Sequence, residues 1–132
     1  MTSIFSKIVN GTLPSYKICE TENCISFLDI FPLVKGHVLV VPKKEVDLIF
    51  DLDTNIYHEL WDLSKLVAKA IEDSVLCKRV GIAVIGLEVP HAHVHLVPLQ
   101  NMEDINFSKP KISLSNIEME MISEKIRMAI KK

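Results

Sequence analysis

Three of the five histidines in this chain occupy alternate positions within the stretch VPHAHVHLVP. Successive side chains of a β-strand point to opposite faces, so His91, His93 and His95 are expected to line one face of a strand. A neutral imidazole can attack phosphorus and form a covalent intermediate. Neighbouring imidazoles can orient the attacking ring and donate hydrogen bonds to phosphate oxygens. The pattern therefore predicts a histidine nucleophile that acts on a phosphate group.

Two other interpretations of the three histidines remain open. Adjacent histidines on one face of a strand lie roughly 6.6–7 Å apart at Cα, and the outer pair roughly 13–14 Å apart. A zinc–nitrogen bond is only about 2.0–2.1 Å long, which disfavours one ion held by all three, although His37 could supply another ligand. The third interpretation is that they are solvated strand residues without a chemical role. This is the favoured interpretation for a single histidine, but not for three in register.

The composition is that of an ordinary soluble globular protein, with 48% hydrophobic and 24% charged residues. A formal net charge of −2 gives no electrostatic reason to expect nucleic acid or an anionic membrane as a partner. No apolar run is long enough to span a bilayer, and the first residues lack the pattern of a secretory signal. Cys19, Cys24 and Cys77 have no CxxC spacing and are expected to be reduced thiols of a cytoplasmic protein.

Hydrophobic periodicity and capping residues predict an α+β fold. A short helix is expected at residues 4–8, a long helix from residue 53 or 54 to about 74, and a terminal helix after a capping box formed by Ser115 and Glu118. Residues 98–114 are polar and irregular. Five strands are expected, at residues 16–19, 24–30, 36–42, 80–86 and 91–97.

The chain resembles the histidine triad (HIT) family of nucleotide-binding proteins. HAHVHLVP fits the family's His-x-His-x-His motif, and SIFSKIVNGTLPSYKICE, FLDIFPLVKGHVLVVPKKEV and IFDLD follow the family's order and spacing. The resemblance implies a five-stranded antiparallel sheet with one long helix, a short N-terminal helix and a C-terminal helix. It implies one domain over residues 1–132, with a core at 3–100 and an extension at 101–132.

The resemblance also assigns residue roles. It implies that His93 is the nucleophile, that His91 and His95 support it, and that His37 helps to set the orientation and protonation of the triad. Asp29 would bind the ribose hydroxyls, and Gly86 matches a glycine of the phosphate loop. The positions that would enclose the base are Ile4, Phe5, Ile8, Phe27, Leu28, Ile30 and Leu39.

The activity that the resemblance implies is hydrolysis or transfer at the α-phosphate of a purine nucleotide. The expected substrate is an adenosine monophosphate ester or phosphoramidate, cleaved through a nucleotidyl-His93 intermediate without a metal or cofactor. A homodimer is expected, with residues 61–71 as a contact. Two alternatives are a non-enzymatic or very slow nucleotide-binding scaffold protein of the same fold, and a metal-binding protein that uses His37, His91 and His93.

The sequence departs from the family pattern at two places. Many members have a Cys-x-x-Cys and a later histidine that bind structural zinc together with a triad histidine. Ser3, Ser6 and Glu45 stand at these positions, so no structural zinc is expected. The usual glycine-rich phosphate loop is also shortened to GIAVIGLEVPH. Leu87 replaces the usual Gln, and Glu88 would repel a bound phosphate.

Overall fold

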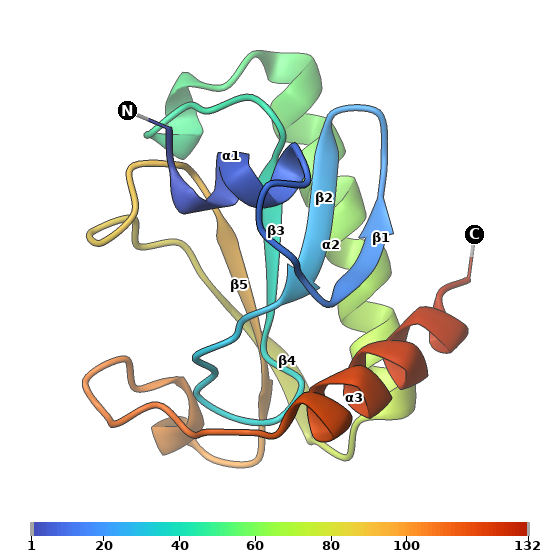
Figure 1. The fold of residues 1–132 in the computed structure, drawn as a ribbon. Coiled ribbons are helices and arrows are strands. Elements are labelled where there is room, and N and C mark those ends of the chain that lie inside the picture. The colour runs from blue at the N-terminus through green and yellow to red at the C-terminus, as the bar shows by residue number, and fades with distance from the viewer. Residues whose placement is uncertain (1, 132) are drawn as a thin grey trace.

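The structure is a computed structural model that describes residues 2–131 (Figure 1). Its strands occur as a group of three and a group of two, separated by helices, in an α+β arrangement. In chain order they are α1 (Ile4–Val9), β1 (Lys17–Glu20), β2 (Cys24–Leu28), β3 (Val38–Pro42), the 3₁₀ helix η1 (Ile49–Asp51), α2 (Thr54–Ser74), β4 (Arg79–Ala83), β5 (Val94–Leu99), the 3₁₀ helix η2 (Met102–Ile105) and α3 (Asn116–Ala129).

The five strands form one sheet in the order β1-β2-β3-β5-β4, and all four neighbouring pairs are antiparallel. The expected five-stranded antiparallel sheet is therefore confirmed. In the central pair, Leu39 of β3 lies opposite His95 of β5. This register places the last triad histidine in the middle of the sheet.

Helices cover both faces of the sheet, with α2 on one face and the short α1 on the other (Figure 1). Val38 and Val40 of β3 belong to the core beneath α2, whereas Leu39 and Val41 pack with Phe5 of α1. Because side chains alternate along a strand, β2 and β3 contribute to both layers. The α1 layer is the smaller of the two, and it is the one that the triad joins.

Helix α2 buries the apolar stripe that its sequence predicts. Leu60, Leu63, Val67, Ala70 and Ile71 are all buried. Helix α3 begins with the expected capping box, in which Ser115 accepts a hydrogen bond from the Glu118 amide and the Glu118 carboxylate accepts one from the Ser115 amide. Contacts with α2 and β1 hold α3 at one end of the domain core.

Four of the strands are shorter than expected at the end that lies beside the cleft described below. β2 ends at Leu28, β3 begins at Val38, β4 ends at Ala83 and β5 begins at Val94. At Gly36 and Gly86 the φ angles are 90° and 71°, which is a left-handed conformation that ends a strand. Further along, the amide of Ala92 donates to the Val46 carbonyl, so the chain before Val94 does not pair within the sheet.

The three cysteines are free thiols, and Cys24 lies in the core as the expected small hydrophobic residue. Burial raises the pKa of the Cys24 thiol to about 12. His58 is exposed on α2, as expected. None of the helices in residues 2–131 is both long and apolar enough to cross a membrane.

Candidate active site

His93 lies just before β5, and one of its ring nitrogens is hydrogen-bonded to the main chain. Its Nδ1 atom lies 2.7 Å from the carbonyl oxygen of His91. A carbonyl can only accept, so Nδ1 carries the proton and donates it. In the neutral ring, Nε2 is therefore left with a free lone pair. Burial is the main cause of a lowered pKa at His93, and it favours this neutral, nucleophilic form.

His95 is fixed in the opposite tautomer through His37. The Leu33 amide donates to Nδ1 of His37 at 3.0 Å, so the proton of a neutral His37 must be on Nε2. This Nε2 lies 3.0 Å from Nδ1 of His95, which therefore accepts. The remaining proton of His95 is on its own Nε2. These hydrogen bonds make Nε2 of His95 a donor, whereas Nε2 of His93 is an acceptor or nucleophile.

Both rings of this pair are neutral near pH 7. Burial lowers the pKa of His37 to about 3 and that of His95 to about 4. The charges of neighbouring histidines act in the same direction. The assigned tautomers therefore persist across the neutral pH range.

His91 differs from the other two triad members, because it does not line the cleft. Its side chain is fully buried behind α1, with its ring centroid 5.7 Å from that of Phe5. Its Nε2 donates to the Pro42 carbonyl at 2.8 Å. The expectation that all three histidines line one face of a strand is wrong, because β5 begins at Val94 and contains only His95; His93 still lines the cleft, whereas His91 does not.

A cleft of about 660 Å³ opens in front of His93 and His95. His93 itself is only 7% exposed, but its ring forms part of the cleft wall. All seven residues expected to enclose a base contribute to this wall, as do Asp29 and Gly86. Leu28 lines the cleft although it packs mainly in the α2 core, and Ile30 is half exposed at the rim. The cleft is lined by Ile4, Phe5, Ile8, Leu13, Pro14, Ser15, Phe27, Leu28, Asp29, Ile30, Phe31, Leu39, Ile85, Gly86, Leu87, Glu88, Val89, His93, His95, Phe107 and Lys111.

Asp29 follows β2 and is held at the edge of the cleft. One carboxylate oxygen accepts from the Phe31 amide at 2.9 Å, and the other lies 3.6 Å from Nε2 of His37. Burial is the largest influence on the Asp29 carboxyl and raises its pKa, which the Phe31 hydrogen bond partly offsets. A carboxyl group placed here can accept hydrogen bonds from hydroxyl groups of a ligand.

Comparison with known proteins identifies the family. Residues 10–102 match the model of the HIT domain. The chain belongs to the HIT family. It is 34% identical over 134 residues to an adenosine 5′-monophosphoramidase of Schizosaccharomyces pombe, covering 99% of this chain and 100% of that protein.

Solved structures agree with this HIT domain over nearly its whole length. A Hit-like protein involved in cell-cycle regulation from Bartonella henselae has a TM-score of 0.85 at 26% identity, covering 98% of this chain and 96% of that one. A zinc-bound histidine triad family protein from Mycobacterium smegmatis has a TM-score of 0.82 at 28% identity, covering 98% and 93%. The α+β HIT fold is thereby shown.

The four positions at which the resemblance places zinc ligands do meet in this HIT domain, but they form a hydrogen-bonded cluster. Glu45 accepts from the Ser3 amide and the Ser6 hydroxyl, both at 2.7 Å. The Ser3 hydroxyl lies 2.7 Å from Nδ1 of His91, whose other nitrogen donates to a carbonyl, so Nδ1 accepts. Zinc prefers thiolate, imidazole and carboxylate ligands, whereas two of these four positions offer serine hydroxyls, and the His91 lone pair already accepts a hydrogen bond. The cluster does not fit zinc.

One other group of potential metal ligands occurs within residues 2–131. Ligand atoms of Asp29, His37 and His95 lie within 4.8 Å of one another. These are not the His37, His91 and His93 set considered as an alternative from the sequence. The Leu33 amide keeps the His37 proton on Nε2, the atom that would have to bind the ion. The histidine pair as arranged serves hydrogen bonding instead of metal coordination.

Sequence reasoning missed eight residues of the cleft wall. Three of them, Phe31, Ile85 and Val89, are adjacent in sequence to residues already singled out, and Leu13, Pro14 and Ser15 lie in the stretch between α1 and β1. Phe107 and Lys111 are different, because they come from the irregular segment beyond the family motif. No pattern in that segment indicates a return to the cleft. The missed residues are Leu13, Pro14, Ser15, Phe31, Ile85, Val89, Phe107 and Lys111.

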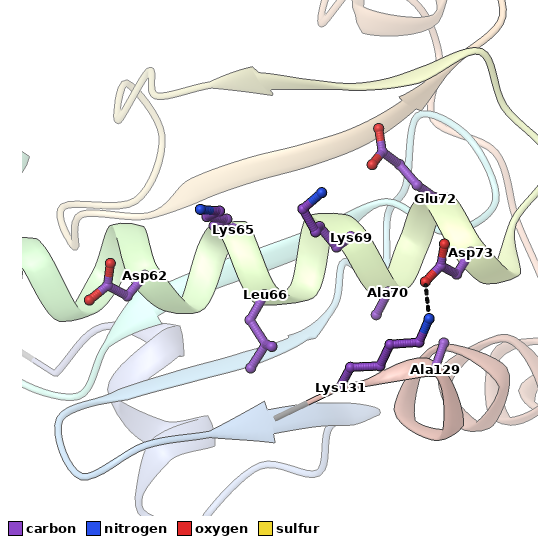
Figure 2. A pocket seen from close by; sticks show the side chains of 9 residues that line it. All are labelled: Asp62, Lys65, Leu66, Lys69, Ala70, Glu72, Asp73, Ala129 and Lys131. Atoms are coloured by element: carbon purple, nitrogen blue, oxygen red, sulfur yellow. Dashed lines mark ion pairs between the residues drawn. The ribbon is translucent and has the colours of Figure 1, made fainter.

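A second hollow, of about 470 Å³, lies between α2 and α3 (Figure 2). Its walls carry mostly charged side chains, including Lys65 and Lys69 from the solvent face of α2. Lys131 and Asp73 form an ion pair across it at 3.3 Å. It contains no histidine and is a solvated charged surface, distinct from the cleft.

Proposed function

We propose that this HIT protein cleaves a bond at the α-phosphorus of an adenosine nucleotide, an ester or a phosphoramidate, through a covalent nucleotidyl-His93 intermediate. One observation carries the proposal. The His91 carbonyl holds the His93 proton on Nδ1 and leaves the Nε2 lone pair available at the wall of the cleft. The relative from Schizosaccharomyces pombe, named as an adenosine 5′-monophosphoramidase, supports this choice of substrate.

The reaction of a phosphoramidate proceeds in two balanced steps. Nε2 of His93 attacks phosphorus, the P–N bond breaks, and the amine leaves with a proton from water. The ring becomes a cation when it bonds to phosphorus, and the His91 carbonyl stabilises it through the Nδ1 proton. Water then attacks phosphorus, the P–Nε2 bond breaks, and a proton returns to solvent. The products are the amine and the nucleoside monophosphate.

His95 would stabilise the negative charge on the phosphate oxygens during the displacement. Its Nε2 proton is free to bond a phosphate oxygen because Nδ1 is occupied by His37. The two rings are adjacent, with centroids 4.8 Å apart. One phosphate can therefore meet both the nucleophile on His93 and the donor on His95.

The remaining cleft residues would bind the nucleoside. Phe5 and Phe27, with ring centroids 5.9 Å apart, offer aromatic surface to a purine, together with the aliphatic residues around them. Asp29 would accept hydrogen bonds from the ribose hydroxyls. A mostly apolar wall with a few polar groups is typical of a small-molecule site.

We also propose that the chain forms a homodimer, although the strip at residues 61–71 is a poor contact. Its apolar residues Leu63, Val67 and Ile71 face the protein's own core. The outer strand β4 and the loop after it expose apolar side chains at Ile82 and Leu87, which suit a subunit contact better. Light scattering should give twice the chain mass, and a monomer mass would exclude the dimer.

Intact-mass measurement tests the proposed activity. Mixing the protein with an adenosine phosphoramidate and quenching in base, where phosphohistidine-type bonds survive, should give a species heavier by one adenylyl group. The adduct should be absent from His93→Ala, because the nucleophile is gone, and turnover should fall by a factor of about 10⁴ or more.

The altered loop favours one alternative, a nucleotide-binding protein with very slow turnover. Leu87 and Glu88 line the cleft where the usual family loop holds phosphate. A wild-type protein that binds adenosine monophosphate but turns over no faster than His93→Ala would favour this alternative over the enzyme.

A further inference from the structure

The charge balance of the cleft is unfavourable for an anionic ligand. Among the described residues that line it, the charged side chains are Asp29, Glu88 and Lys111. The lowered pKa values of His93 and His95, caused mainly by burial, leave both rings without charge at neutral pH. Lys111 is therefore the one cationic group of this wall that could oppose the two carboxyl groups when a phosphate binds.

Lys111 is held at the rim by the segment that follows β5, drawn in orange in Figure 1. Its Nζ donates to the Phe107 carbonyl at 3.1 Å and lies 5.8 Å from the centroid of the Phe107 ring. That ring packs edge to face on His95, with centroids 4.7 Å apart. Lys111 is thus placed one aromatic ring away from the proposed phosphate donor.

The backbone on the other side of Lys111 is anchored too. The amide of Ile112 donates to the Pro32 carbonyl at 2.9 Å, which attaches this segment to the loop that follows Asp29. Phe107 on one side and Ile112 on the other fix the path of the chain past the cleft. The position of Lys111 at the wall therefore follows from two tertiary contacts and does not depend on its own flexible side chain.

The ammonium group keeps binding capacity for a ligand. An ammonium has three donors, and the structure assigns one of them, to the Phe107 carbonyl. The ion pairs formed within residues 2–131 do not include Lys111. Burial is the largest influence on the pKa values of Asp29, His37 and His95, and the charge of Lys111 is a smaller influence on each. Its field therefore reaches this side of the cleft.

We propose that Lys111 binds the negatively charged phosphate of the nucleotide and gives the cleft its selectivity for nucleotides over neutral nucleosides. In this role the segment after β5 replaces the longer phosphate loop that the usual family chain has before the triad. The inference rests on the proposed function, because it assumes that a nucleotide occupies the cleft.

Calorimetric titration of the full chain with adenosine monophosphate and with adenosine tests this role. Lys111→Gln should weaken binding of adenosine monophosphate about tenfold, the effect of losing one charge-assisted hydrogen bond, and leave adenosine binding unchanged. Lys111→Arg should retain most of the affinity. The matched control is Lys109→Gln, since Lys109 is in the same segment, pairs with Glu103 at 3.9 Å and does not line the cleft.

Two further readouts separate charge recognition from a structural effect. Affinity of the wild type for adenosine monophosphate should fall as salt increases, and this dependence should be weaker in Lys111→Gln. Glu88→Gln should have the opposite effect to Lys111→Gln and strengthen binding of the nucleotide. Thermal melting would check that each variant folds, as expected for exposed positions.

The outcomes are distinguishable. If Lys111→Gln binds adenosine monophosphate as well as the wild type, the inference is overturned while the proposed function stands. If it loses both ligands equally, Lys111 acts on the fold and the inference is overturned as well. A wild type that binds neither ligand would overturn the inference and the proposed function together.

Discussion

At the scale of single residues, the site depends on which ring nitrogen carries each proton. Two backbone groups decide this, the His91 carbonyl for His93 and the Leu33 amide for His37 and, through it, His95. A backbone group can act in only one direction, as donor or as acceptor. The tautomers are therefore set by the fold before any ligand arrives.

The pH dependence of adduct formation follows from the lowered pKa of His93. Burial is the main cause, and it keeps the ring neutral below the usual histidine value of 6.5. The rate of the first turnover should fall as the pH is lowered, with a midpoint below 6.5. Rapid-quench measurements with a substrate that does not titrate in this range would check it. A midpoint at or above 6.5 would contradict the assigned burial effect.

The sequence predicted those residues of the site that lie within recognisable motifs. His93, His95, His37 and Asp29 lie at or beside the cleft, but their roles stay predictions. His91 was misplaced because the alternation of a strand was extended into a loop. Lys111 was not foreseen, because its place depends on tertiary contacts that leave no local pattern in the sequence.

At the scale of elements, α1 is a wall of the cleft that is attached through polar side chains. Ser3 caps the helix, accepting from the Ser6 amide at 3.0 Å, and its hydroxyl also bonds His91. Glu45, which follows β3, accepts hydrogen bonds from the same turn. These hydrogen bonds lower the pKa of the Glu45 carboxyl, and the one from the Ser3 amide has the largest effect. A helix of six residues has little stability of its own, so these bonds and the packing of Phe5 position it.

Removing the Ser3 hydroxyl should affect both stability and binding. Ser3→Ala loses a helix cap and a buried hydrogen bond, which should cost about 1–2 kcal/mol of the free energy of unfolding. Nucleotide affinity should also fall, because Phe5 moves with the helix. Urea denaturation and calorimetry would measure the two effects.

The matched control for Ser3→Ala is Ser115→Ala, which removes the cap of α3 at a residue that does not line the cleft. It should reduce stability by about 1 kcal/mol and leave nucleotide affinity unchanged. Equal loss of affinity in both variants would show that the effect on binding comes from general destabilisation and not from α1.

The elements themselves were predicted well in kind and less well in extent. Helix α2 follows from a long apolar stripe and the start of α3 from its capping box, both of which are local signals. The ends of β2, β3, β4 and β5 near the cleft were placed too far out. Before β5, for example, the Ala92 amide bonds to the Val46 carbonyl outside the sheet, and no local residue preference reports such a partner.

At the scale of the whole molecule, burying uncharged histidines makes stability depend on pH. The unfolded chain binds a proton at His37 near pH 6.5, whereas the folded protein does so only near pH 3, mainly because of burial. The unfolded state therefore gains protons first as pH falls. The contribution of His37 to stability is complete above 6.5 and is lost progressively between pH 6.5 and 3.

Lowering the pH from 7 to 5 should reduce the free energy of unfolding by about 2 kcal/mol through His37 alone. Urea denaturation at the two pH values would measure the loss, and His37→Gln should show a smaller one. His58→Gln serves as the control, because His58 is exposed and should leave the loss unchanged. Identical losses in wild type and His37→Gln would contradict the assignment.

Glu20 affects stability only at more acidic pH. Hydrogen bonds from Lys17 and, to a smaller extent, Lys43 lower the pKa of its carboxyl to about 2.

The acceptor that orients the proposed nucleophile is part of the main chain, and this has a consequence for how the proposed activity could be lost. Every amino acid carries a carbonyl, so no replacement at position 91 deletes the acceptor. A rotated peptide plane between residues 91 and 92 would do so, for example after an insertion in the loop before it. Such a variant would keep all five histidines in its sequence and still fail to form the covalent adduct.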